Sequence, residues 1–284
     1  MKTKTTFMML FLGLYLIACG PAEEKKTEED TDATTKTEEP AAPNVVGEEI
    51  TYSTDSTEMK GYIAYDASKE GPRPGILVVH EWWGHNEYAR KRADMLAELG
   101  YVALAVDMYG DGQTADHPDD AGNFAGMVFQ NIDEAKARFI RAMETLKSNA
   151  NTDGDKIAAI GYCFGGSVAL SMANAGMDLD GVVAFHSGVA LPIQPDSGAV
   201  KAKIIVCNGA DDTFIKPEHI TAYKASMDAA GADYQYIAYP GAVHSFTNPG
   251  ADTVGTKFNL PLAYNQEADQ KSWEEMKKLF EEIF

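Results

Sequence analysis

The chain has 284 residues and carries 24 basic against 43 acidic side chains, which gives a formal net charge of −19. This balance excludes a nucleic-acid partner, because nothing supplies the basic surface that phosphate contacts need. Three widely spaced cysteines form neither a disulfide framework nor a metal-binding pattern, so we expect no metal and no cofactor.

The first 18 residues have the features of a secretory signal peptide. Lys2 and Lys4 precede an apolar run over 7–17 that is too short to span a membrane. The run ends in Leu-Ile-Ala-Cys-Gly over 16–20, which resembles the lipobox of bacterial lipoproteins; the alternative is a plain signal peptide with a chance cysteine. We expect an exported protein, anchored by lipid on Cys19 to the bacterial cell envelope, on the periplasmic side or at the outer-membrane surface.

Residues 19–47 have the composition of a disordered acidic tether. They are rich in Glu, Lys, Thr, Asp, Ala and Pro and contain almost no large apolar side chain. Such a segment cannot bury enough surface to offset the entropy lost on ordering. We therefore expect one folded domain over 48–284. The tether carries part of the acidic excess, with eight acidic and three basic side chains, so the net charge of the chain is not evidence for a cationic substrate.

From residue 48 onward, strand-like and helix-like segments alternate. We predict a hairpin with strands over 50–53 and 59–65, followed by apolar strands that are typical of a parallel sheet covered on both faces. These strands span 75–80, 101–107, 156–160, 181–186, 203–207 and 234–239. The predicted helices span 88–99, 132–146, 167–173, 217–230 and 263–284, and 111–123 is expected to be a long loop of the kind that forms lids. The pattern predicts a single α/β domain with a mostly parallel, doubly wound sheet, whose functional residues lie outside the carboxyl ends of the strands.

The segment 161–166, Gly-Tyr-Cys-Phe-Gly-Gly, joins a predicted strand to a predicted helix. The α/β-hydrolase fold places its nucleophile in this strand–Gly-X-Cys-X-Gly–helix context, on a sharp turn whose glycines avoid a clash between strand and helix. Cys163 would then lie at a helix N-terminus, which favours a thiolate. The alternative is a glycine-rich turn with an inert buried cysteine.

Two further strand ends supply the residues that such a nucleophile needs. Asp211 and Asp212 follow one strand and His244 follows the next, in the chain order nucleophile, acid, histidine. A thiolate attacks a carbonyl carbon, a histidine moves the proton, and a carboxylate fixes the histidine tautomer. The oxyanion would be bound by the N–H of Phe164 and by an N–H from the loop 81–84, Glu-Trp-Trp-Gly.

Together these motifs resemble the dienelactone hydrolase family over 48–284. The matching segments are His-Glu-Trp-Trp-Gly at 80–84, Asp-Met-Tyr-Gly at 107–110, Gly-Tyr-Cys-Phe-Gly-Gly at 161–166, Gly-Ala-Asp-Asp-Thr-Phe at 209–214 and Gly-Ala-Val-His-Ser-Phe at 241–246. The resemblance implies the α/β-hydrolase fold and a triad of Cys163, Asp212 and His244. It also implies that Trp82 N–H is the second oxyanion donor and that Glu81 contacts the resting thiol and helps to activate it.

The resemblance is incomplete where the substrate would bind. Family members that act on dienelactone bind the substrate carboxylate with two arginines, at positions that here are Asp111 and Asn248. The resemblance therefore implies the fold and the reaction type without the named substrate. Trp83, His85 and Tyr109 are candidate pocket residues, because they lie in or beside the loops that follow two of the strands.

We therefore expect a hydrolase that cleaves a carboxylic ester or lactone through a Cys163 acyl-enzyme. Its expected partners are a small-molecule substrate and, through lipid on Cys19, a membrane. One alternative is a thioesterase or a broad carboxylesterase with the same machinery. An alternative from another class is a surface lipoprotein that only binds a ligand, but such a protein has no reason to keep the nucleophile, acid, histidine and both glycines.

Overall fold

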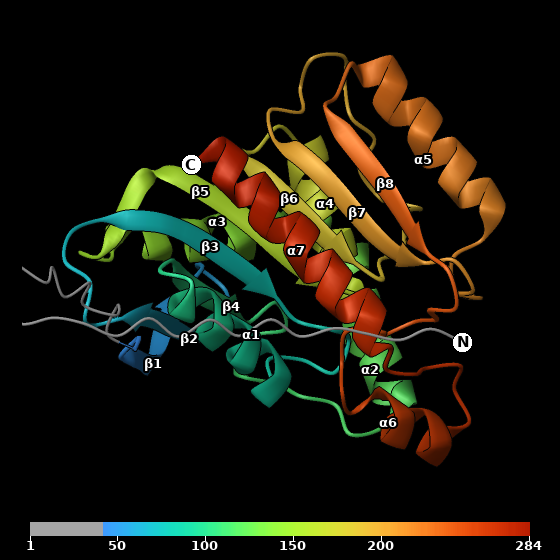
Figure 1. Ribbon diagram of the computed structural model, residues 1–284, viewed down its shortest axis with the longest axis horizontal. Helices are drawn as coiled ribbons and strands as arrows, with labels where there is room; N and C mark the ends of the chain where they lie inside the picture. Colours follow the sequence, from blue (N-terminus) through green and yellow to red (C-terminus); the bar gives the residue numbers. More distant parts are fainter. Residues whose placement is uncertain (1–41) are drawn as a thin grey trace, which may run out of the picture. The chain divides into compact units, whose positions relative to one another are not determined.

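The computed structural model describes residues 42–284, so the predicted signal peptide, Cys19 and most of the predicted tether lie outside the described residues. The strands are β1 (Val45–Ser53), β2 (Glu58–Asp66), β3 (Arg73–Val79), β4 (Val102–Val106), β5 (Thr152–Tyr162), β6 (Gly181–Phe185), β7 (Lys203–Gly209) and β8 (Tyr234–Tyr239). They form one sheet in the order β1-β2-β4-β3-β5-β6-β7-β8 (Figure 1). The pairs β1–β2 and β2–β4 are antiparallel and all others are parallel, as the alternating pattern predicts.

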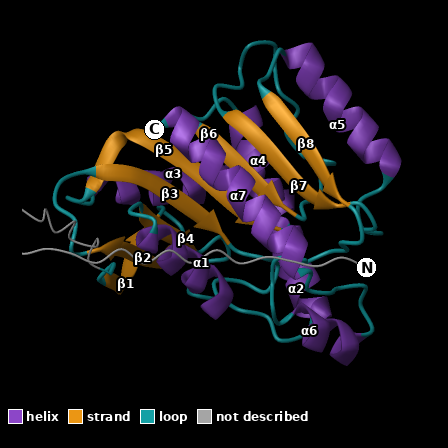
Figure 2. Cartoon of the chain, viewed as in Figure 1, coloured by secondary structure: helices purple, strands orange, loops and turns teal. Residues whose placement is uncertain are grey.

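Helices pack on both faces of this sheet, and Figure 2 shows the two layers around the strands. They are α1 (Glu87–Glu98), α2 (Pro118–Gln130), α3 (Ile132–Ser148), α4 (Phe164–Asn174), α5 (Pro217–Ala230), α6 (Ala251–Phe258) and α7 (Gln266–Ile283). Buried side chains of α1 and α7 join the core on one face, and those of α2, α3, α4 and α5 join the core on the other. Among residues 42–284, no helix is both long and apolar enough to cross a membrane.

Successive side chains of each strand alternate between these two cores. Leu77 and Val79 of β3 pack on the α3–α4 face, whereas Ile76 and Val78 pack on the α1–α7 face. The same alternation separates two cysteines, since Cys207 of β7 is fully buried on the α1–α7 face and Cys163 packs on the opposite face. Both are free thiols.

Many element bounds differ from the sequence-based expectation by one to four residues, and three larger differences stand out. The first strand begins at Val45, three residues before the expected start of the domain, because Val45 pairs with Asp66 of the hairpin. The second half of the loop expected over 111–123 is helical: Pro118 opens α2, and the His117 side chain accepts a hydrogen bond from the N–H of Asp119. The short helix α6 was not predicted.

The turn between β5 and α4 is as sharp as the sequence predicts. Cys163 has φ 53° and ψ −116°, a left-handed conformation that a side-chain-bearing residue rarely adopts. A Cβ on Gly161 would lie 2.2 Å from the carbonyl oxygen of Gly165, and a Cβ on Gly165 would lie 2.3 Å from that of Val79. Both positions therefore require glycine, and the strained turn projects Cys163 beyond the end of β5.

Candidate active site

The carboxyl ends of three parallel strands bring Cys163, Asp212 and His244 together. Cys163 follows β5, Asp212 follows β7 and His244 follows β8. The imidazole lies between the other two side chains: its Nδ1 is 2.7 Å from Asp212 Oδ2 and its Nε2 is 3.0 Å from Cys163 Sγ. The three residues singled out by the motifs thus form one continuous hydrogen-bonded line.

The neighbours of His244 change its protonation. Burial alone would lower the pKa of His244, but the charge of a Cys163 thiolate and the contact with Asp212 outweigh burial and raise this pKa to about 10. Asp212 is itself fixed, because its Oδ1 accepts the backbone N–H of Phe214 at 2.9 Å. The arrangement therefore favours an imidazolium at neutral pH, with Nε2 of the ring in contact with the Cys163 sulfur.

A cavity of about 240 Å³ opens over Cys163 and His244. Its other walls come from six segments of the chain: Trp82, Ala125, Phe129, Phe164, Ser167, Gly188, Phe214, Ile215 and Leu262. None of these lining residues is a lysine, arginine, aspartate or glutamate. The cavity therefore suits a small uncharged molecule better than an anion.

Three expected pocket residues do not line this cavity. Trp83 is stacked on Phe258 of α6 with ring centroids 6.1 Å apart, and His85 is buried at 4% exposure. Tyr109 lines a separate cavity of about 620 Å³ whose other walls come mainly from α2 and α3. Its hydroxyl donates to the carbonyl oxygen of Trp82 at 2.8 Å, so Tyr109 supports a cavity residue rather than contacting the cavity.

Several walls of the cavity were not identified from the sequence. Phe129 lies on α2, which was expected to be partly loop, and Leu262 lies between α6 and α7, where no motif marks it. Phe214 is the exception: it ends the segment 209–214, and its ring lies 5.0 Å from that of His244. An aromatic residue two positions after the expected acid was the one available signal.

Glu81 occupies a different position from the one that the resemblance implied. Its carboxylate is buried and accepts hydrogen bonds from Ser245 Oγ at 3.0 Å and Asn248 Nδ2 at 2.7 Å, and the thiol of Cys163 bonds to His244 instead. Burial raises the pKa of Glu81, and the two hydrogen bonds oppose that rise. Glu81 thus links the loop after β3 to the loop that carries His244. Asn248, which stands at one of the two positions where family members that act on dienelactone have an arginine, takes part in this contact.

Two residues of the cavity wall have a backbone N–H without a protein partner. Phe164 is the first residue of α4, so its N–H has no partner within the helix, and Trp82 lies in the loop after β3. Neither N–H donates to a protein group in the part of the chain that the structure describes. Within residues 42–284, no cluster of three or more His, Cys, Asp or Glu side chains is arranged to hold a metal ion.

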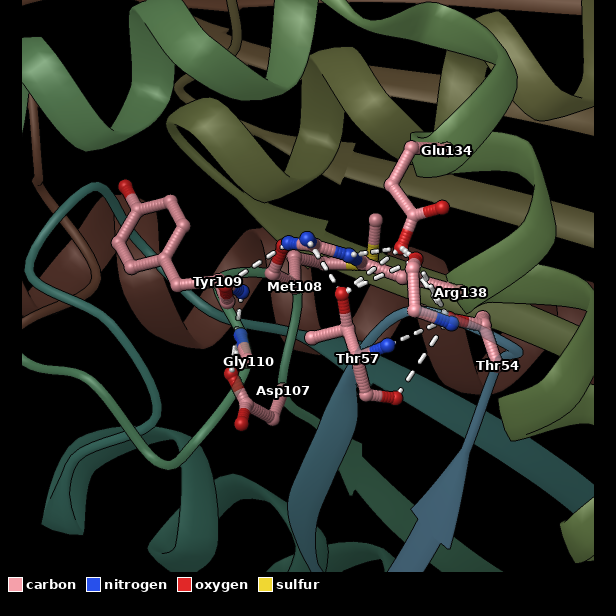
Figure 3. Close-up of polar contacts among 9 residues, drawn as sticks. Thr54, Thr57, Asp107, Met108, Tyr109, Gly110, Glu134 and Arg138 are labelled. Carbon is pink, nitrogen blue, oxygen red and sulfur yellow. Dashed lines mark hydrogen bonds and ion pairs between the residues drawn. The ribbon is translucent and has the colours of Figure 1, made fainter.

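The turn after β4 is held rigidly next to this site. Figure 3 shows Arg138 of α3 reaching the turn, where its Nη1 donates to the carbonyl oxygens of Met108 and Tyr109, each at 2.8 Å. Asp107 Oδ1 accepts the backbone N–H groups of Tyr109 and Gly110 from within the turn. Arg138 is itself oriented by Glu134 at 3.0 Å.

Comparisons with known proteins bear on the family and the fold of the chain. The model of the dienelactone hydrolase family matches residues 59–284. A putative carboxymethylenebutenolidase of Aquifex aeolicus is 28% identical over 214 residues, which is 74% of this chain and 90% of that protein. Among solved structures, m3DLH is 37% identical with a TM-score of 0.80, and a dienelactone hydrolase-like promiscuous phosphotriesterase from metagenomic libraries is 34% identical with a TM-score of 0.78. Each match covers 84% of this chain and 99% of the other, and the two structures confirm the predicted fold class.

Proposed function

The chain belongs to the dienelactone hydrolase family, and on that premise we propose that it cleaves a carboxylic ester or lactone through an acyl-enzyme on Cys163. The observation that carries this proposal is the position of His244, which contacts Asp212 on one side and the thiol on the other. Family membership supports a hydrolase that acts on ester bonds. The thiol, the proton carrier and the orienting carboxylate supply the chemistry for it.

In the acylation half-reaction, the Cys163 thiolate attacks the carbonyl carbon and a tetrahedral oxyanion forms. The N–H groups of Phe164 and Trp82 would bind this oxyanion, where charge develops during the reaction. The C–O bond then breaks as His244 imidazolium donates its proton to the leaving oxygen. An alcohol is released from an ester, or the free hydroxyl end of the opened ring remains on the acyl group of a lactone.

In the deacylation half-reaction, neutral His244 accepts a proton from water, and the hydroxide attacks the thioester carbon. The same two N–H groups bind the second oxyanion. The C–S bond breaks, the carboxylic acid leaves, and the thiolate with its imidazolium partner is restored. Asp212 stays ionised throughout and stabilises the imidazolium by its 2.7 Å contact.

The lining of the cavity supports a preference for substrates whose acyl group is uncharged. Apart from His244 of the hydrogen-bonded line, the cavity walls carry no lysine or arginine that could bind a carboxylate. Of the two positions without arginine, Asp111 is exposed and acidic, and Asn248 is bonded to Glu81. A thioester or a broad range of carboxylic esters would use the same residues. A protein that only binds a ligand would not need a thiol aligned with a histidine and a carboxylate.

Intact-mass measurement after mixing with a p-nitrophenyl ester tests the proposal. We expect an acyl adduct that peptide mapping places on Cys163 and that Cys163→Ala abolishes together with turnover, because the nucleophile is lost. Cys207→Ala is the matched control: this thiol is fully buried, and burial raises its pKa to about 12, so its loss leaves the adduct unchanged. Wild-type turnover by Cys163→Ala would refute the mechanism.

For the residues before 42, we propose processing at Cys19 and lipid anchoring to the cell envelope. The support comes from the sequence alone, namely the charged start, the short apolar run and the lipobox-like segment over 16–20. Radioactive palmitate fed to expressing bacteria should label the wild-type protein in the membrane fraction. Cys19→Ala should abolish the label and release the protein from membranes. Labelling that persists in Cys19→Ala would contradict the proposal.

A further inference from the structure

His80 is a fully buried histidine that the motifs left without a role. It follows β3 directly, and both of its ring nitrogens have a backbone partner. Nδ1 lies 2.5 Å from the carbonyl oxygen of Glu81, and Nε2 lies 3.2 Å from the backbone nitrogen of Met108. Its ring is stacked on that of Phe164, with centroids 5.7 Å apart.

These two contacts determine where the proton of His80 resides. Met108 N–H can only donate, so Nε2 is an acceptor and carries no hydrogen. Burial lowers the pKa of His80, which keeps the ring neutral. The single remaining proton is therefore on Nδ1, where it is donated to the Glu81 carbonyl.

The Glu81 carbonyl belongs to the same peptide unit as the N–H of Trp82. A trans peptide is planar, and its C=O and N–H point in opposite directions, so fixing the oxygen fixes the direction of the hydrogen. Trp82 lines the cavity with Cys163, and its N–H has no acceptor among the described protein groups. We propose that His80 is a positioning residue that orients the Glu81–Trp82 peptide so that Trp82 N–H can bind the oxyanion.

The neighbourhood of His80 is built to hold that orientation. Met108 is fixed by Arg138 through its own carbonyl, so the N–H that meets Nε2 comes from a rigid turn. The peptide that follows is also held, because Tyr109 donates to the Trp82 carbonyl. Gly84 N–H gives the Glu81 oxygen a second hydrogen bond at 3.1 Å, so loss of His80 would loosen the peptide rather than release it.

Two substitutions of His80 test its two hydrogen bonds separately, the one that Nδ1 donates and the one that Nε2 accepts. In His80→Asn, the side-chain amide nitrogen occupies the place of Nδ1 and can still donate to Glu81. In His80→Gln, the longer side chain places its amide at Nε2 and can still accept from Met108 N–H, but the donor to Glu81 is lost. Each variant keeps one of the two hydrogen bonds, so a purely structural role predicts similar losses for both.

The measurement compares acylation by a p-nitrophenyl ester with alkylation by iodoacetamide. Alkylation needs the thiolate but forms no oxyanion. Removing an oxyanion donor costs about 10²–10³ in rate, and because Gly84 still holds the peptide we expect His80→Gln to slow acylation about ten- to a hundredfold. We expect alkylation to stay within about twofold of wild type, and His80→Asn to lose much less acylation than His80→Gln.

The inference rests on the proposed function, and the outcomes keep the two apart. Equal loss of acylation in both variants, or a parallel loss of alkylation, would overturn the role of His80 in an enzyme that still works. Failure of the wild type to form any acyl-enzyme would overturn the proposed function together with this role. Should either variant not fold, nitrogen NMR of labelled wild-type histidines decides: a proton on Nδ1 of His80 supports the inference, and a proton on Nε2 overturns it.

Discussion

At the scale of single residues, the proton of His244 is held by its two partners. The ordinary histidine pKa is about 6.5. Here the thiolate and Asp212 raise it to about 10 despite burial. A group whose pKa is raised on folding stabilises the folded state fully below the unfolded pKa, and this contribution is lost as the pH rises through the folded pKa. His244 therefore supports both stability and proton donation across neutral pH, and both decline toward pH 10.

We predict that kcat/KM for a neutral ester falls on the alkaline side near pH 10, where His244 loses the proton that the leaving oxygen needs. Asp212→Asn removes one stabilising charge, so its alkaline limb should shift to lower pH and its maximum rate should fall. A pH–rate profile of both proteins checks this. An alkaline limb that does not move in Asp212→Asn would show that another group titrates there.

The three residues of the hydrogen-bonded line could be predicted because the topology of the sheet places them at the same edge. Cys163, Asp212 and His244 each follow a parallel strand, and the carboxyl ends of such strands share one edge. The cavity walls could not be predicted in this way, because Phe129 and Leu262 reach the cavity only through the tertiary placement of α2 and of the segment before α7. The contact of Glu81 with Asn248 was missed for the same reason, since 167 positions separate them.

At the scale of elements, helix α1 is attached to the C-terminal part of the chain by one buried cation. Arg92 Nη2 donates to Asp269 Oδ1 of α7 at 2.7 Å and to the carbonyl oxygen of Thr247 at 2.6 Å. Its guanidinium also lies over the rings of Tyr88 and Trp273. Arg92 thus joins α1, α7 and the segment that follows His244.

We predict that Arg92→Met lowers the free energy of unfolding by about 3 kcal/mol, because it leaves Asp269 and the Thr247 carbonyl without their partner. For a domain of this size the melting temperature should fall by about 6–12 °C. Arg90→Met is the matched control: Arg90 lies on the same helix and pairs with Glu49 at the surface, so its loss should cost at most about 1 kcal/mol. Equal shifts in thermal unfolding would contradict the assignment.

Element boundaries followed from local signals where these were strong. The helix over Pro217–Ala230 has a proline at its start and Gly231 in the left-handed region at its end, and both bounds were predicted. The helix α2 was missed because glycines and aspartates over 111–123 resemble a loop, although Pro118 at its first turn is a start signal. Its apolar contacts with the core decide the structure, and those are not local.

At the scale of the whole molecule, an acidic chain carries a cavity that is lined mainly by apolar side chains. The net charge is −19, and neither lysine nor arginine lines the space above Cys163. Such a surface does not steer anions inward. The exposed Lys216 follows Ile215 of the cavity wall in the sequence, so a test should isolate the effect of this cation.

We predict that matched esters, one neutral and one with a carboxylate near the scissile bond, show no preference for the anionic member in kcat/KM. A charged hydrogen bond contributes about 1.5–3 kcal/mol, so an arginine clamp would produce about a ten- to hundredfold preference. Lys216→Gln measured with the same pair isolates the contribution of that lysine. A preference of about tenfold or more for the anion would show that a cation binds it.

The separation of the two thiols by the sheet has a consequence for oxidation. Strand β6 lies between β5 and β7, and Cys163 and Cys207 face opposite layers, so no disulfide can form between them. Hydrogen peroxide oxidises a thiolate to a sulfenic acid and releases hydroxide, which takes a proton to become water. Without a resolving cysteine, a second equivalent of peroxide oxidises the sulfenic acid to a sulfinic acid. We predict that brief peroxide exposure inactivates the enzyme in a way that dithiothreitol reverses. Prolonged exposure should irreversibly add two oxygen atoms to the Cys163 peptide. In a compartment other than a reducing cytoplasm, this reaction would limit how long each molecule stays active.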